Sequence, residues 1–222
     1  MQVNPLDGHA IWSAVYDGAP NPLLDLERRT VTPWLPPLLD RTFIDVACGT
    51  GRWSQHASDR GAHVFGADFC APMLDAAAQP TRNRFVLADA ARLPFSDALA
   101  DLTMCAFAAG YLECPARLIA ELARITRRGG FIAVTDVHPA GLGIGWRRSF
   151  RRGGETYDIE HHVHPLAEYL TAARDCCLRI EHLAEACFGE PERQVFEGCG
   201  RAAIFEAMCR VPAVFAVMWR RA

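Results

Sequence analysis

The sequence predicts an α/β fold in which a mostly parallel sheet is covered by helices on both faces. Short apolar runs alternate with helix-compatible stretches from residue 43 onward, and the first run leads into the turn Gly49-Thr-Gly51. Alternating strands and helices are typical of a parallel sheet with crossover helices. A strand, a glycine turn and a helix form the opening unit of a nucleotide-binding sheet.

Length and composition fit one soluble globular domain. A chain of 222 residues is long enough for a full core, so we treat 1–222 as a single domain. The net charge of −3 argues against a nucleic-acid-binding surface, and the absence of lysine excludes lysine-dependent chemistry. No apolar run approaches the ~20 residues that span a bilayer, and no signal peptide is recognisable. We therefore expect a cytoplasmic protein with no nucleic-acid or membrane partner.

The nine cysteines include no Cys-x-x-Cys pair, and most lie in apolar runs, as do Cys105, Cys176, Cys177 and Cys187. In a reducing compartment such cysteines are best interpreted as small core residues, without a disulfide framework or a zinc cluster.

Residues 1–40 are expected to form an N-terminal cap on the core. Ile11 to Val15 is compatible with a short helix, and the prolines from Pro20 onward are expected to interrupt the rest. Among the aromatic residues of this segment, we assign Tyr16 to contact with the ligand, together with Trp12.

The rest of the chain divides into a cofactor-binding half, 41–139, and an acceptor-side region, 140–222. A helix near 115–127 is expected to stop at Arg127-Arg128-Gly129-Gly130, where basic residues precede glycine. The predicted strands number seven: 43–46, 63–67, 84–88, 102–107, 131–137, 178–184 and 214–219. The other predicted helices are 52–60, 71–78, 166–176 and 201–209, with a loop at 189–200.

Three acidic residues lie at or near the ends of the first three runs. Asp45 lies inside the first run, Asp68 ends the second, and Asp89 ends the third. A carboxylate at the end of the second strand is suited to the two hydroxyls of a ribose. Three acids at one sheet edge fit a cationic, ribose-bearing ligand better than a pyrophosphate.

These segments resemble the class I S-adenosylmethionine-dependent methyltransferases, closest to their ubiquinone/menaquinone-biosynthesis-like small-molecule branch. The resemblance rests on Asp45-Val-Ala-Cys-Gly-Thr-Gly, on Gly66-Ala-Asp-Phe-Cys-Ala-Pro-Met-Leu and on Ala88-Asp-Ala-Ala-Arg-Leu-Pro-Phe, and is specific over 43–138. It implies a Rossmann-like, doubly wound, seven-stranded sheet with an antiparallel last strand. It also implies S-adenosyl-L-methionine as cofactor, S-adenosyl-L-homocysteine as product and a small-molecule acceptor. Ala47 departs from the family, because many members have glycine there.

The resemblance implies a role for each residue of the motifs. The methionine part of the cofactor would lie on the turn at Ala47, Gly49 and Gly51, and Asp45 would support the turn or the amino group. Asp68 would accept from the ribose hydroxyls. The remaining contacts would be Phe69 and Met73 beside the adenine, Asp89 and the Ala90 backbone at its amine, and Ala106 and Phe107 near the methionine.

Methyl transfer from a sulfonium needs alignment, exclusion of water and, for some acceptors, a base. The candidate catalytic residues are His138, with Asp136 expected to orient its imidazole, and Tyr111. Trp146 and Arg147 are the candidate acceptor-binding residues. His161, His162 and His164 are expected on a surface strand, and we predict no metal site.

Two alternatives stay open. One is an NAD(P)-dependent oxidoreductase on a similar sheet, although the chain lacks the lysine of the usual Tyr/Lys proton donor. The other is a non-catalytic protein that binds S-adenosylmethionine without transferring its methyl group.

Overall fold

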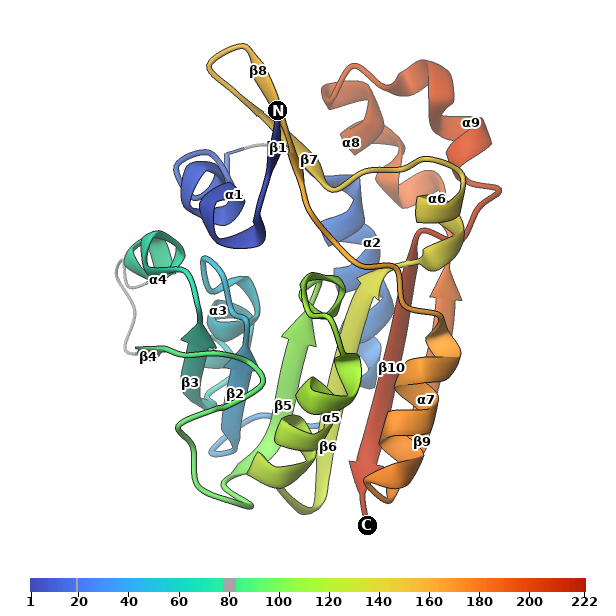
Figure 1. Cartoon of the computed structure of the whole chain (residues 1–222). Helices are drawn as coiled ribbons and strands as arrows, with labels where there is room; N and C mark the ends of the chain where they lie inside the picture. Colours follow the sequence, from blue (N-terminus) through green and yellow to red (C-terminus); the bar gives the residue numbers. More distant parts are fainter. Residues whose placement is uncertain (19, 78–82) are drawn as a thin grey trace.

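A computed structural model describes residues 1–18, 20–77 and 83–222, and shows one large sheet with helices on both faces (Figure 1). The sheet has seven strands in the order β4-β3-β2-β5-β6-β10-β9. Strand β10 runs antiparallel to both of its neighbours, β6 and β9, and the other neighbouring strands of this sheet are parallel. The strands are β2 (Thr42–Val46), β3 (His63–Asp68), β4 (Arg84–Leu87), β5 (Ala100–Ala106), β6 (Thr126–Val137), β9 (Leu178–Ala186) and β10 (Val214–Arg221). The predicted fold class, including the antiparallel last strand, is confirmed.

Alternating side chains of the strands supply two apolar layers. Ile44 and Val46 of β2 face helices α5 (Pro115–Ile125) and α7 (Leu166–Asp175). Phe43 of the same strand faces α2 (Pro22–Val31) and α3 (Arg52–Ser58) on the other side. Period-two alternation in a strand packed on both faces explains why these runs are almost entirely apolar.

A second, three-stranded sheet lies beyond the ends of the parallel strands. It consists of β1 (Gln2–Val3), β8 (Glu155–Ile159) and β7 (Ser149–Arg152). Helix α1 (Pro5–Trp12) packs beside it, with Trp12 stacked on Phe150 at a ring-centroid distance of 5.0 Å. Together α1 and this small sheet cover the edge at which β2, β3 and β5 end (Figure 1).

Shorter elements complete the chain. They are η1 (Thr32–Trp34), α4 (Ala71–Ala77), η2 (Ala109–Tyr111), α6 (Pro139–Gly143), η3 (Glu190–Glu192), α8 (Arg193–Gly198), η4 (Ala202–Ile204) and α9 (Phe205–Met208). Residue 78 of the predicted helix 71–78 lies outside the described residues. No helix in the described ranges combines the length and the apolar character needed to cross a membrane.

Several local predictions were wrong. Helix α2 was missed because Pro22 looked like a breaker, whereas it occupies the first helical turn, where no N–H donor is needed. The stop at Arg127-Arg128-Gly129-Gly130 belongs to β6, because α5 already ends at Ile125 and Thr126 pairs with Ala100 of β5. The predicted loop 189–200 contains η3 and α8. Residues 160–165, which carry the histidine triplet, form no strand.

The cysteine assignments were partly right. Cys105 is buried, Cys176 and Cys187 are partly buried, and Cys177 is exposed. Cys177 follows α7 with a positive φ of 56°, in the turn that leads to β9, which explains why its side chain is not in the core.

The strand order determines where a ligand is expected. From β2 the chain continues to β3 and β4 on one side, then crosses to β5 on the other side of β2. Such a switch in direction leaves a crevice outside the carboxyl ends of the two central strands, and α/β sheets bind their ligands there.

Candidate functional site

The turn after β2 is held in a left-handed backbone conformation. Ala47, Gly49 and Gly51 have φ values of 54°, 54° and 83°. Glycine adopts this region freely, whereas an alanine there costs about 1–2 kcal/mol. A Cβ on Gly51 would lie 3.3 Å from the Cβ of Ala77 in α4, while a Cβ on Gly49 would meet no atom within 4 Å. Open space therefore lies over Gly49, where a ligand can approach the backbone.

Asp68 connects the end of β3 to this turn. One carboxylate oxygen accepts from the backbone N–H of Gly49 at 2.8 Å, and the other accepts from Cys70 N–H at 2.9 Å. The side chain is buried, and burial raises the pKa of its carboxyl group while the two N–H donors oppose the rise. Asp68 thus lies beside the glycine turn, as the predicted ribose-binding role requires.

Asp45 supports the turn from within the sheet. Its side chain is 2 % exposed and accepts from the Ser54 hydroxyl of α3 at 2.8 Å. Burial raises the pKa of Asp45 from 3.8 to about 7, against the opposing effects of Ser54 and Arg52. Two roles were predicted for Asp45, and this hydrogen bond corresponds to the first, support of the turn.

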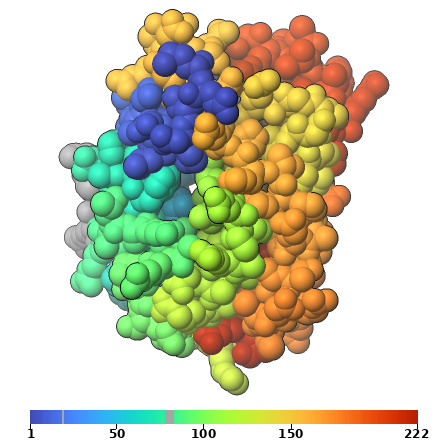
Figure 2. Space-filling model, viewed as in Figure 1, coloured from blue at the N-terminus to red at the C-terminus, as the bar shows by residue number. Residues whose placement is uncertain are grey.

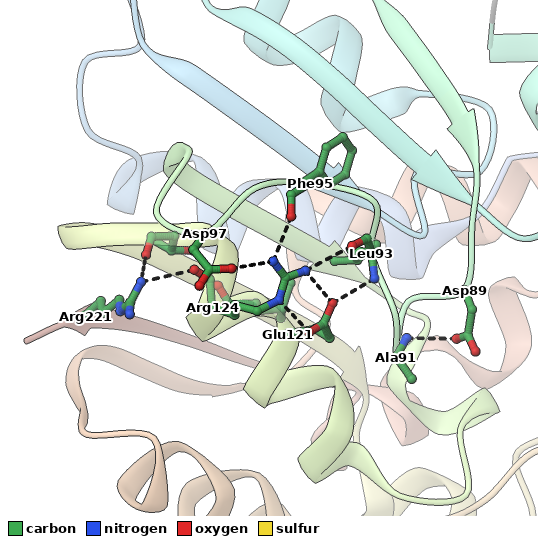
Figure 3. Close-up of polar contacts among 10 residues, drawn as sticks. Asp89, Ala91, Leu93, Phe95, Asp97, Glu121, Arg124 and Arg221 are labelled. Atoms are coloured by element: carbon green, nitrogen blue, oxygen red, sulfur yellow. Dashed lines mark hydrogen bonds and ion pairs between the residues drawn. The ribbon is translucent and has the colours of Figure 1, made fainter.

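Asp89 lies at the same sheet edge, in the loop after β4. Its carboxylate is exposed and accepts from Ala91 N–H at 2.8 Å (Figure 3). Behind it Arg124 of α5 donates to the carbonyls of Leu93 and Phe95, and so holds the loop on the sheet. This anchoring orders the segment that contains Asp89.

The other residues predicted near the adenine differ in exposure. Phe69 is 39 % exposed at the site, whereas Met73 is 1 % exposed in α4. The Ala90 side chain is partly buried and packs against the core.

The segment after β5 forms the wall of the site opposite the glycine turn. It follows Ala106, begins with Phe107 at a φ of 56°, and includes η2 (Ala109–Tyr111). Arg148 donates to the Phe107 carbonyl at 3.1 Å, and its guanidinium lies 4.7 Å from the centre of the Tyr111 ring. Burial raises the pKa of Tyr111, which Arg148 opposes. Tyr111 therefore lies at the site, and it is held there by an arginine that the sequence did not single out.

Asp136 pairs with this arginine. The two side chains form a buried ion pair, and the second oxygen of Asp136 accepts from Gly110 N–H at 2.7 Å. The prediction that Asp136 orients His138 was wrong. Both carboxylate oxygens of Asp136 are used to hold the segment after β5 and Arg148.

His138 has different partners. Its Nδ1 accepts from Ala140 N–H at 3.1 Å, and its Nε2 is buried 3.8 Å from a Glu185 oxygen. Because an N–H donor occupies the Nδ1 lone pair, Nε2 carries the proton in the neutral ring. His138 thus caps α6 and offers no free lone pair.

The acceptor-side predictions separate in space. Tyr16 lies against Trp12 at 4.7 Å between ring centres, and burial raises its pKa to about 12. Trp146 packs on Phe188 at 6.2 Å. Arg147 is exposed and lies 3.8 Å from Asp158 of the small sheet, away from Tyr111. The structure thus brings the neighbouring arginine to the site and leaves Arg147 outside it.

The three histidines of the triplet have different contacts. The rings of His162 and His164 stack at 5.9 Å, and His164 contacts the Leu112 carbonyl at 2.8 Å. Within the described ranges, no group of three or more His, Cys, Asp or Glu side chains is placed to hold a metal ion.

Two residues of the N-terminal segment were missed. Glu27 of α2 is fully buried and accepts from Arg52 and Trp53 of α3. His9 of α1 contacts both Phe69 and Tyr111. The spacing of His9, Trp12 and Tyr16 by three and four residues was a signal that these side chains share one side. In Figure 2 a narrow hollow opens between this segment (blue) and the segment after β5 (green).

Comparison with known proteins gives matches to methyltransferases. The "Methyltransferase domain" model matches residues 44–134. A malonyl-[acyl-carrier protein] O-methyltransferase of Pectobacterium atrosepticum is 30% identical over 150 residues, covering 64% of this chain and 59% of that enzyme. A demethylmenaquinone methyltransferase of Clavibacter sepedonicus is 29% identical over 187 residues, covering 82% of this chain and 73% of that enzyme.

The fold agrees. A crystal structure of an S-adenosylmethionine-dependent methyltransferase from Mesorhizobium loti superposes with a TM-score of 0.69 at 23% identity, covering 88% of this chain and 98% of that one. The chain spans 48% to 59% of the length of the malonyl-[acyl-carrier protein] O-methyltransferases that it matches. Sequence, sheet order and glycine turn agree: residues 44–134 match a methyltransferase domain, and the chain has the fold of S-adenosylmethionine-dependent methyltransferases.

Proposed function

We propose that this chain transfers a methyl group from S-adenosylmethionine to a small-molecule acceptor by in-line displacement. The observation that carries the proposal is the contact between Asp68 and the Gly49 N–H, at the switch point of the sheet. It puts a carboxylate beside the open space over a left-handed glycine turn. A carboxylate at this place suits the hydroxyls of a ribose attached to a cation, and its negative charge disfavours a pyrophosphate beside it.

The proposal assigns the cofactor-binding residues as follows. Asp68 accepts from the ribose hydroxyls, and Gly49 and Gly51 leave room for the methionine part. Asp45 holds the turn through Ser54. The remaining proposed contacts are Ala47, Phe69, Met73, Asp89, Ala90, Ala106 and Phe107.

When bound, the cofactor supplies an electrophilic methyl group on a positively charged sulfur. The residues of this chain align the acceptor with that group and exclude water. Tyr111, held by Arg148, and Tyr16 from the N-terminal segment are proposed to line the acceptor side, with Trp146 further along. Because Tyr16 and Tyr111 both have raised pKa values, they are neutral at physiological pH and act as hydrogen-bonding walls.

The acceptor class rests on the relatives. One is an O-methyltransferase for malonyl-[acyl-carrier protein] and another acts on demethylmenaquinone. We propose a small acceptor of this general kind for the chain 1–222 as one methyltransferase domain. A cytoplasmic location and the absence of nucleic-acid and membrane partners belong to the same proposal. The net charge of −3 supports the absence of a nucleic-acid partner.

Calorimetry tests the ligand. We expect binding of S-adenosylmethionine and S-adenosylhomocysteine and no binding of NAD; binding of NAD alone would overturn the proposal. Release of S-adenosylhomocysteine across a panel of hydroxyl, carboxyl, amine, thiol and carbon acceptors then tests transfer. A protein that binds the cofactor yet turns over no acceptor in the panel would support the non-catalytic alternative.

A matched pair of variants localises the binding. Asp68→Asn should weaken S-adenosylmethionine binding, whereas Asp75→Asn, an exposed aspartate of α4, should leave it unchanged. Equal effects of the two substitutions would remove Asp68 from the site.

A further inference from the structure

His9 occupies a central position over the candidate site. It lies on α1, in the N-terminal segment, yet its ring contacts both walls. The ring centres are 6.0 Å from Phe69, which follows Asp68, and 4.8 Å from Tyr111 of the segment after β5. The side chain is partly buried. His9 therefore lies between the proposed cofactor-binding side and the proposed acceptor side.

One hydrogen bond determines the tautomer of this histidine. Nδ1 lies 2.7 Å from the carbonyl oxygen of Pro5. A carbonyl only accepts, so Nδ1 carries the proton. Nε2 makes no hydrogen bond to any residue that the structure describes. Its lone pair is therefore available, unlike the Nδ1 lone pair of His138, which an N–H donor occupies.

The helix that carries His9 is firmly placed. The Asn4 side chain caps it by accepting from Asp7 N–H at 2.9 Å. Gly8 packs so closely on β8 that a Cβ there would lie 3.0 Å from the Ile159 side chain. A base on a capped and closely packed helix keeps its orientation, which general-base catalysis requires.

The charges around His9 suit a base that is neutral before the reaction. Burial lowers its pKa; the Pro5 contact and the Asp68 carboxylate oppose the shift, and the Arg148 guanidinium adds to it. The other charged groups on the elements packed against α1 are on α4, β7 and β8: Asp75, Arg151, Arg152, Glu155 and Asp158. Asp68 and Arg148 are the charges that act on the His9 ring.

We propose that His9 is the general base of the transfer, acting on an acceptor whose attacking atom carries a proton. This inference rests on the proposed function. As the acceptor atom bonds to the methyl carbon and the carbon–sulfur bond breaks, the acceptor proton passes to Nε2 of His9. The positive charge of the sulfonium thus reappears on the imidazolium, near the Asp68 carboxylate. Loss of that proton to water restores the neutral ring.

Nuclear magnetic resonance of the histidine rings tests the geometry without an acceptor. In the free protein at neutral pH, His9 should be protonated on Nδ1; protonation on Nε2 would overturn the proposal. Its pKa should be lower with S-adenosylmethionine bound than with S-adenosylhomocysteine bound, since only the former is a sulfonium. A unit charge within roughly 10 Å at an effective dielectric of about 20 gives a difference of about 1 pH unit.

Equal His9 pKa values in the two complexes would place the ring away from the reacting sulfur and overturn the proposal. His63, exposed at the start of β3, is the control whose ring signals should be the same in the two complexes. The signal of His9 is assigned by its loss in His9→Asn, or by contacts to the Tyr111 ring if that variant does not fold. Calorimetry distinguishes failure of the His9 proposal from failure of the proposed function, because a protein that binds neither ligand contradicts the proposed function itself.

Kinetics with an acceptor found in the panel complete the test. His9→Asn should lower kcat by about 10²–10⁴-fold and remove the fall of the rate at acidic pH, with S-adenosylmethionine affinity unchanged. His63→Asn should match the wild type. A His9→Asn enzyme with an unaltered kcat and pH profile would refute the role.

Discussion

Glu27 is the residue whose removal should reveal how the N-terminal segment is held on the core. Its side chain is 0 % exposed and accepts from Arg52 Nη2 at 2.5 Å, Trp53 Nε1 at 3.0 Å and Thr135 Oγ1 at 2.8 Å. These donors come from α3 and β6, so a single carboxylate joins α2 to a helix and a strand of the core.

The expected loss follows from these contacts. Glu27→Ala leaves three donors without an acceptor, and breaking a buried ion pair costs about 3–5 kcal/mol. Arg52 remains 28 % exposed and recovers part of its hydration, which favours the lower part of that range. Because domains unfold with about 5–15 kcal/mol, the variant should still fold but with a clearly lower denaturation midpoint.

Urea denaturation at neutral pH measures the effect, and α2 provides its own control. Asp25 pairs with Arg28 on the exposed side of the same helix, where the side chains are 37% and 61% exposed. Asp25→Ala should cost no more than about 1 kcal/mol. If Glu27→Ala and Asp25→Ala lower the free energy of unfolding equally, the buried carboxylate does not hold the segment and the reasoning is refuted.

Three further predictions follow from buried carboxylates. Asp68→Asn should weaken S-adenosylmethionine binding by about 1–3 kcal/mol in calorimetry, because the amide cannot accept from both hydroxyls of the ribose; unchanged affinity would contradict this. Asp45, with a folded pKa of about 7 against 3.8 in the unfolded chain, destabilises the native state increasingly as pH rises through that interval. The wild type should therefore lose about 3 kcal/mol more than Asp45→Asn between pH 5 and pH 8 in urea titrations, and parallel losses would refute the assignment. Arg148→Met leaves Asp136 buried and unpaired and should cost about 3–5 kcal/mol, whereas adding Asp136→Leu should recover part of the loss; a double variant that is no more stable than the single one would argue against the pair.

The strands were predictable because each is a local apolar run, while several helix ends were not. The position of a proline within its turn decides whether it begins or breaks a helix, and Pro22 begins one. The basic and glycine residues after α5 form a plausible helix stop, but pairing between Thr126 and Ala100 extends the strand through them. Tertiary hydrogen bonding prevailed over local preference at this point.

The site shows the same division. Sequence motifs predicted that Asp45, Asp68 and the glycine turn belong together, because parallel strands end at one edge and short turns stay near their strands. They singled out Arg147 and not Arg148, because two adjacent arginines just before β7 look alike in the sequence although only Arg148 is buried. Only the packing of the small sheet shows which of the two is buried.

The sequence by itself therefore predicted the seven strands of the large sheet and the glycine turn of the proposed cofactor edge, because each is a local run of residues. The tertiary structure decided which distant side chains complete the site. Glu27 meets Thr135 across 108 residues, and His9 reaches Tyr111 from the N-terminal helix. Such pairings depend on how the N-terminal segment folds over the sheet, and no local pattern of residues records that path.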